Sequence, residues 1–82
     1  MIIEYDPQGV CSKHFTIEID GTTITKVSII GGCPGNLQGI SALLVGMDIH
    51  DAIKRLENIP CRSKNTSCPD QIAKALKTAL NA

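Results

Sequence analysis

The sequence has few aromatic residues, no excess of either charge and no long apolar run. Its only aromatic side chains are Tyr5 and Phe15, and it has no tryptophan, so it offers bases or sugars no stacking surface. Eight basic and eight acidic residues give a formal net charge of zero, whereas proteins that bind phosphate backbones usually carry a basic excess. These features argue against a nucleic-acid partner and against an electrostatic membrane anchor.

The sequence also lacks targeting signals. Its first residues, Met-Ile-Ile-Glu-Tyr-Asp, contain neither the basic region nor the apolar segment of a secretory signal. No apolar run approaches the roughly 20 residues that a transmembrane helix needs. We therefore expect a cytoplasmic protein with no membrane partner.

The chain is short but has four cysteines. With 82 residues, we expect residues 1–82 to fold as one domain with a thin hydrophobic core. Natural domains near this size often add a metal or disulfide staple. Cytoplasmic thiols are kept reduced, so these cysteines indicate metal ligands or redox groups ahead of a disulfide framework.

The first part of the sequence predicts a β-hairpin. Apolar and polar residues alternate from His14 to Asp20, as in a half-buried strand. Asp20-Gly21 is a hairpin turn signal, and Val27 and Ile29 indicate the partner strand. Ile24 is out of phase with Val27, which predicts a bulge near it. We expect a short third strand at Ile3 and Tyr5.

From Gly31 onward the apolar spacing becomes helical, and three helices are predicted. Gly46 is placed to end the first, Asp48 to cap the second and Pro60 to end it. We thus expect an α+β fold: a small antiparallel sheet of two to three strands, followed by three helices packed on one face. The predicted apolar stripes are Leu37, Ile40, Leu43 and Leu44; Ile49, Ala52, Ile53 and Leu56; and Ile72, Ala73, Leu76, Ala79 and Leu80.

The four cysteines all fall in predicted loops or at element ends, where the backbone can turn thiolates toward one atom. An isolated cysteine is more often a small buried apolar residue, but that role suits core positions better. The sequence therefore predicts one metal site, formed by Cys11 before the hairpin, Cys33 at the sheet-to-helix corner, Cys61 after the second helix and Cys68 at the start of the third.

Two of these cysteines precede a proline at the expected start of a helix, as Cys33-Pro34 and Cys68-Pro69. Proline is favoured in the first helical turn, and the N–H groups and dipole at a helix N-terminus stabilise a thiolate. The simpler alternative is that Ser67 and Asp70 form an N-cap and its partner, with Cys68 incidental.

The spacing of the four cysteines does not indicate which metal they bind. Zinc sites usually contain two cysteines separated by two to four residues, and this sequence has no such pair. Iron–sulfur clusters also take four cysteines, so both cofactors stay open. His14 could replace one sulfur, although a histidine on a strand surface is more often solvated, as we expect for His50. Lys13, Arg62 and Lys64 could offset the charge of four thiolates, or be ordinary surface residues.

With these residues in view, the sequence resembles the TSCPD domain family. The family's name stands here as Thr66-Ser67-Cys68-Pro69-Asp70, and the likeness extends to Val10-Cys11, Gly31-Gly32-Cys33-Pro34-Gly35-Asn36 and Cys61. The resemblance implies iron binding by Cys11, Cys33, Cys61 and Cys68 and a link to ribonucleotide reduction, because related domains end some ribonucleotide reductases.

A more distant likeness is to iron–sulfur cluster assembly scaffolds, through Cys11, Cys33 and Cys68. Cys61 and Ser12 depart from the scaffold pattern, which favours a fixed four-sulfur site over cluster transfer. This likeness and the missing zinc pair favour iron–sulfur over zinc. Two alternatives stay open: a thiol redox protein using Cys61 and Cys68, and a structural or adaptor domain with incidental cysteines. The sequence has no catalytic triad, paired carboxylates or phosphate-binding loop, so we expect no catalytic activity of its own.

Overall fold

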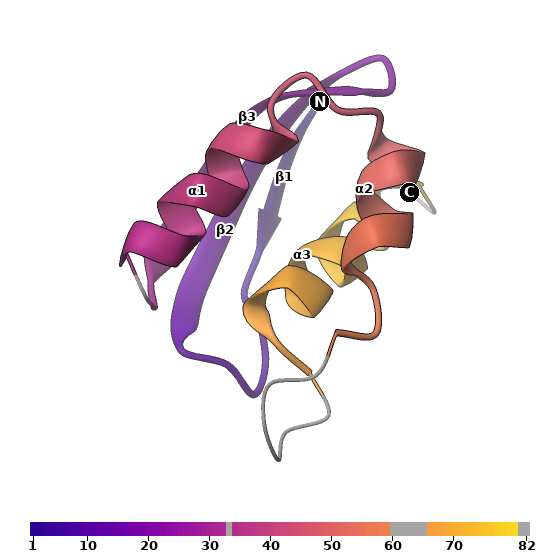
Figure 1. Ribbon diagram of the computed structural model, residues 1–82. Helices are drawn as coiled ribbons and strands as arrows, with labels where there is room; N and C mark the ends of the chain where they lie inside the picture. Colours follow the sequence, from indigo (N-terminus) through magenta and orange to yellow (C-terminus); the bar gives the residue numbers. More distant parts are fainter. Residues whose placement is uncertain (33, 60–65, 81–82) are drawn as a thin grey trace.

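The fold is a three-stranded antiparallel sheet followed by three helices, as a computed structural model shows for residues 1–32, 34–59 and 66–80 (Figure 1). The strand order is β1-β2-β3. The α+β class predicted from the sequence is therefore confirmed. The strands are β1 (Ile2–Tyr5), β2 (Ser12–Asp20) and β3 (Thr23–Gly31), and the helices are α1 (Pro34–Leu44), α2 (Ile49–Leu56) and α3 (Cys68–Leu80).

The predicted hairpin is present. Asp20 pairs with Thr23, and Gly21 adopts a φ of 65°, as the first central residue of a two-residue hairpin turn requires. The register shifts where Glu18 pairs with Lys26 but Ile19 pairs with Ile24. This shift is the expected bulge, and it returns Ile24 to the buried face.

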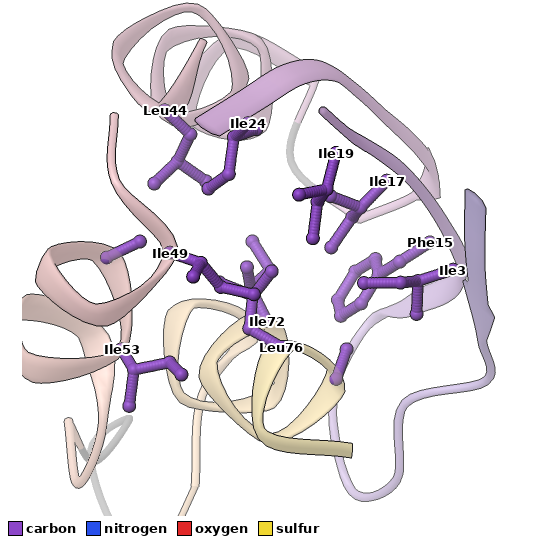
Figure 2. Packing of buried hydrophobic residues seen from close by; sticks show 12 residues of the cluster. Ile3, Phe15, Ile17, Ile19, Ile24, Leu44, Ile49, Ile53, Ile72 and Leu76 are labelled. Carbon is purple, nitrogen blue, oxygen red and sulfur yellow. The ribbon is translucent and has the colours of Figure 1, made fainter. Parts of the chain in front are cut away.

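The core lies between one face of the sheet and all three helices (Figure 2). The buried side chains of β2 alternate along the strand, as a period of two requires. In Figure 1, α1 runs along β3, whereas α2 packs on α3 and α3 reaches β1. The labelled core residues are Ile3, Phe15, Ile17, Ile19, Ile24, Leu44, Ile49, Ile53, Ile72 and Leu76.

Two residues assigned to apolar stripes are exposed instead. Leu43 is 75% exposed and Leu80 is 44% exposed. Leu43 lines the open side of a groove between α1 and α2, and Leu80 is the last residue of α3. Helical periodicity predicts which side of the helix a residue lies on, but it does not predict whether a neighbouring element covers that side.

The ends of α2 are set by local hydrogen bonds. Asp48 caps the helix, because its carboxylate accepts from the His50 N–H, as predicted. The helix stops at Leu56, and Asn58 takes a φ of 64° just after it. Glu57 is the C-cap: its N–H still donates to the Ile53 C=O, but its own backbone is extended, with a ψ of 147°. The chain therefore leaves the helix before Asn58 and before Pro60, which lies outside the described residues. No helix in the described ranges is long and apolar enough to cross a membrane.

Candidate metal centre

Two of the four candidate ligands can be located. Cys11 is exposed in the loop before β2, and Cys68 is the first residue of α3. Both carry free thiols. Cys33 and Cys61 lie outside the described residues, as do Arg62 and Lys64.

Cys11 and Cys68 line the same pocket. Its volume is about 440 Å³, and its wall is completed by residues from the first two turns of α1 and from the start of α3. The pocket exists because α3 folds back to pack on β1, which places the start of α3 beside the loop before β2. Two thiols from nearly opposite ends of the chain therefore share one pocket; its other lining residues are Asn36, Leu37, Ile40, Ser67 and Pro69.

Ser12 holds the Cys68 thiol in place. The Ser12 side chain is buried, with 3% of its surface exposed, and its Oγ lies 3.1 Å from Cys68 Sγ. Sequence reasoning missed this residue, because strict alternation places Ser12 on the outer face with His14. The strand register shifts between Ser12 and His14, and this irregularity turns Ser12 inward.

The Thr66–Asp70 segment starts α3 and presents Cys68. Ser67 caps the helix, because its Oγ accepts from the Asp70 N–H at 3.2 Å. The predicted capping pair is thus confirmed, and it coexists with Cys68 and Pro69 lining the pocket. The cap fixes the first helical turn, and Cys68 is the first residue of that turn.

The buried side chain of Asp70 stabilises the same first turn of α3. Its carboxylate is almost fully buried and accepts hydrogen bonds from Lys74 Nζ, Thr66 Oγ1 and the Asn58 N–H. The bonds from Lys74 and Thr66, and then that from Asn58, lower the pKa of Asp70 to about 2. One carboxylate therefore ties both ends of the connection between α2 and α3 to the first turn of α3, which carries Cys68.

Gln71 joins this turn to the loop that carries Cys11. Its side-chain oxygen accepts from the Gln8 N–H at 3.0 Å, and its amide nitrogen donates to Thr66 Oγ1 at 2.9 Å. Gln71 is buried, and nothing in the sequence marks it except its place directly after Asp70. The bond to Gln8 restrains the loop that leads to Cys11.

Gly32 lets β3 turn sharply into α1. Its φ is 82°, and a Cβ there would lie 2.5 Å from Leu37 Cδ1 and 3.5 Å from the Ser12 N. Only glycine adopts this backbone freely. Gly32 thus brings the start of α1 against Ser12, which itself contacts Cys68.

His14 does not join the cysteines. Its Nδ1 lies 2.6 Å from Asp6 Oδ1 and its Nε2 lies 3.2 Å from Glu4 Oε1. These hydrogen bonds, that to Asp6 first, raise the pKa of His14. Both ring nitrogens are therefore engaged by carboxylates, and replacement of a sulfur by His14 is not supported. Within residues 1–32, 34–59 and 66–80, no three His, Cys, Asp or Glu side chains form a group suited to a metal ion.

The fold and the pocket define a small α+β domain in which two cysteines distant in the sequence, Cys11 and Cys68, line one pocket at the start of α3. A family model, that of the TSCPD domain, matches residues 3–80. The chain therefore belongs to the TSCPD domain family, as its motifs predicted. Comparisons with curated proteins and with solved structures gave no significant match. The likeness to cluster assembly scaffolds stays a prediction.

Proposed function

We propose that this TSCPD domain is a metal-binding module in which Cys11, Cys33, Cys61 and Cys68 hold one metal centre. The observation that supports the proposal is that Cys11 and Cys68 line one pocket although they lie near opposite ends of the chain. A core role for these two cysteines is disfavoured because Cys11 is exposed and Cys68 is only partly buried. The pocket leaves room for an ion or a small cluster.

The surroundings of Cys68 suit a thiolate ligand. The Ser12 hydroxyl can donate to the sulfur across 3.1 Å, and Cys68 is the first residue of α3, at the positive end of the helix dipole. The two remaining ligands adjoin described parts of the site in the sequence. Cys33 follows Gly32, which lies against Ser12, and Cys61 belongs to the connection whose ends are bonded to Asp70.

We favour an iron–sulfur cluster over zinc. The closest cysteines in the sequence, Cys61 and Cys68, are too far apart for a typical zinc-binding pair. Four cysteines are the usual ligand set of two-iron and four-iron clusters. Such a centre would supply electron transfer when bound, in iron–sulfur or ribonucleotide-reduction chemistry.

Anaerobic purification tests the proposal, followed by metal and sulfide analysis and a visible absorption spectrum. We expect a brown protein that loses its colour when Cys11→Ser or Cys68→Ser is introduced, because each change removes a ligand. The unfolding temperature should fall as well, since metal binding is coupled to ordering of the ligand loops. Thr78→Ala, an exposed change near the far end of α3, is the matched control and should keep the cluster.

The other outcomes assign the site differently. One equivalent of zinc in a colourless protein would reject the cluster and keep the module. A folded protein that stays metal-free after anaerobic reconstitution would reject the module. In that case, reversible oxidation of Cys61 and Cys68 would establish the thiol redox alternative.

A further inference from the structure

One edge of the sheet is partly open. The sheet order makes β3 an edge strand. The start of this edge is occupied, because the Ile24 N–H donates to the Met47 C=O and the Gly46 N–H donates to the Ile24 C=O. Thr23 also bridges to Asp48. The segment that follows α1 therefore pairs with β3 only as far as Ile24.

Beyond Ile24, backbone groups of β3 point away from the sheet. Ile19 exchanges hydrogen bonds with Met1, on the β1 side of β2. Residues two and four positions earlier in β2, Ile17 and Phe15, face the same side, because strand backbone groups alternate. Their partners in β3, Val27 and Ile29, must then direct N–H and C=O groups to the free edge. No other segment of the described chain hydrogen-bonds to them.

The open edge borders a hollow. A space of about 400 Å³ lies between β3 and α1, lined in part by Val27, Ile29, Leu37, Gln38 and Ser41. The sequence has no Asp, Glu, Lys or Arg from Val27 to Met47. Native edge strands are usually protected by charges, prolines or bulges. From Val27 to Ile29, β3 carries none of these devices, and the register irregularity opposite Ile30 and Gly31 lies beyond this stretch.

We propose that β3 pairs antiparallel with β3 of a second copy, across a two-fold axis at Ser28. In this register Val27 lies opposite Ile29 of the second copy, so the outward backbone groups of both strands bond to each other. Ser28 lies opposite its own equivalent, and Lys26 lies opposite Ile30. A symmetric interface must be complementary to itself, and this one places no like charges opposite each other.

The register also covers exposed apolar surface. Ile30 is 59% exposed on the outer face of the sheet, and the Lys26 stem of the second copy would pack on it. The result is one continuous sheet with twice the strands. The proposed metal pocket stays accessible, because it lies between α1 and the start of α3 rather than along this edge.

Sedimentation velocity of the full chain tests the pairing, over a concentration series with a non-thiol reductant to exclude disulfides through Cys11. We expect a reversible monomer–dimer equilibrium. Ser28→Lys should raise the dimer Kd about tenfold or more, because it places two positive charges opposite each other. Ser28 is exposed, so circular dichroism should be unchanged. Thr23→Lys adds the same charge to β3 where the edge is already occupied, and it should dimerise like the wild type.

A mixing experiment identifies the axis. Ser28→Lys and Ser28→Glu should each dimerise weakly alone but form a heterodimer when mixed, as detected by native mass spectrometry. A wild-type chain that stays monomeric at every concentration overturns the proposal, and binding of an extended peptide by that monomer would assign the edge to another protein. A dimer insensitive to Ser28→Lys overturns it too, because its interface would lie elsewhere.

Discussion

Replacing Asp70 with asparagine should destabilise the fold at neutral pH. The pKa of Asp70 is lowered from 3.8 to about 2 by the Lys74, Thr66 and Asn58 hydrogen bonds. One pKa unit corresponds to about 1.4 kcal/mol, so the ionised carboxylate contributes about 2 kcal/mol to the free energy of unfolding. For a domain of this size, Asp70→Asn should lower the unfolding temperature by about 10 °C.

The pH dependence distinguishes this charge effect from loss of packing. A group whose folded pKa is lowered contributes its full stability above its unfolded pKa of 3.8 and loses it as the pH falls through about 2. The difference between wild type and Asp70→Asn should therefore be about halved at pH 3 and nearly absent at pH 2.

Urea denaturation of both proteins from pH 7 to pH 2 measures this difference. Asp20→Asn is the matched control, because it makes the same carboxylate-to-amide change at an exposed residue beside the hairpin turn. A loss below about 0.5 kcal/mol at pH 7 would refute the reasoning, since that is the usual range of surface substitutions. A loss that is the same at pH 7 and pH 2 would refute the electrostatic part.

Three further predictions concern the site and its surroundings. Gly32→Ala should destabilise the domain by about 1–3 kcal/mol, because Gly32 has a positive φ and an added Cβ would contact Leu37. Gly39 lies on α1 in open space, so Gly39→Ala should stabilise the domain by about 0.5–1 kcal/mol. Thermal melts measure both changes. An NMR titration of His14 should give a pKa above 6.5. The stability that the His14 ion pairs add to the folded state should be fully present below pH 6.5 and be lost as the pH rises through this raised pKa. Ser12→Ala should keep the metal content, as measured by metal analysis, but shift the reduction potential of an iron–sulfur centre, because a hydrogen bond to the Cys68 sulfur is lost.

Much of the fold could be predicted because its signals are local. The alternation of Phe15, Ile17 and Ile19, the Gly21 turn and the Asp48 cap each depend on residues within a few positions of one another. The exposure of Leu43 could not be predicted, because it depends on which element lies beside α1 in space. Likewise, Pro60 is a strong helix breaker in the sequence, but the backbone is already extended at Glu57.

The candidate site, too, has features that the sequence predicts and features that it does not. The positions of Cys11 and Cys68 at element ends followed from turn and helix signals. The inward turn of Ser12 followed from a register shift that period-two alternation does not contain. The buried role of Gln71 depends on Gln8 and Thr66, which are brought to it by the packing of α3 on β1. Contacts between distant segments carry no signature in a single sequence.

The packing of α3 on β1 also sets an order of events in folding. Each strand pairs with its neighbour in the chain, so the sheet closes only short loops. The contact of α3 with β1 joins opposite ends of the chain and must close the longest loop. We expect the pocket shared by Cys11 and Cys68 to form in this late step. In stopped-flow refolding, metal capture should then follow hairpin formation, so that a loaded centre marks a chain that has finished folding.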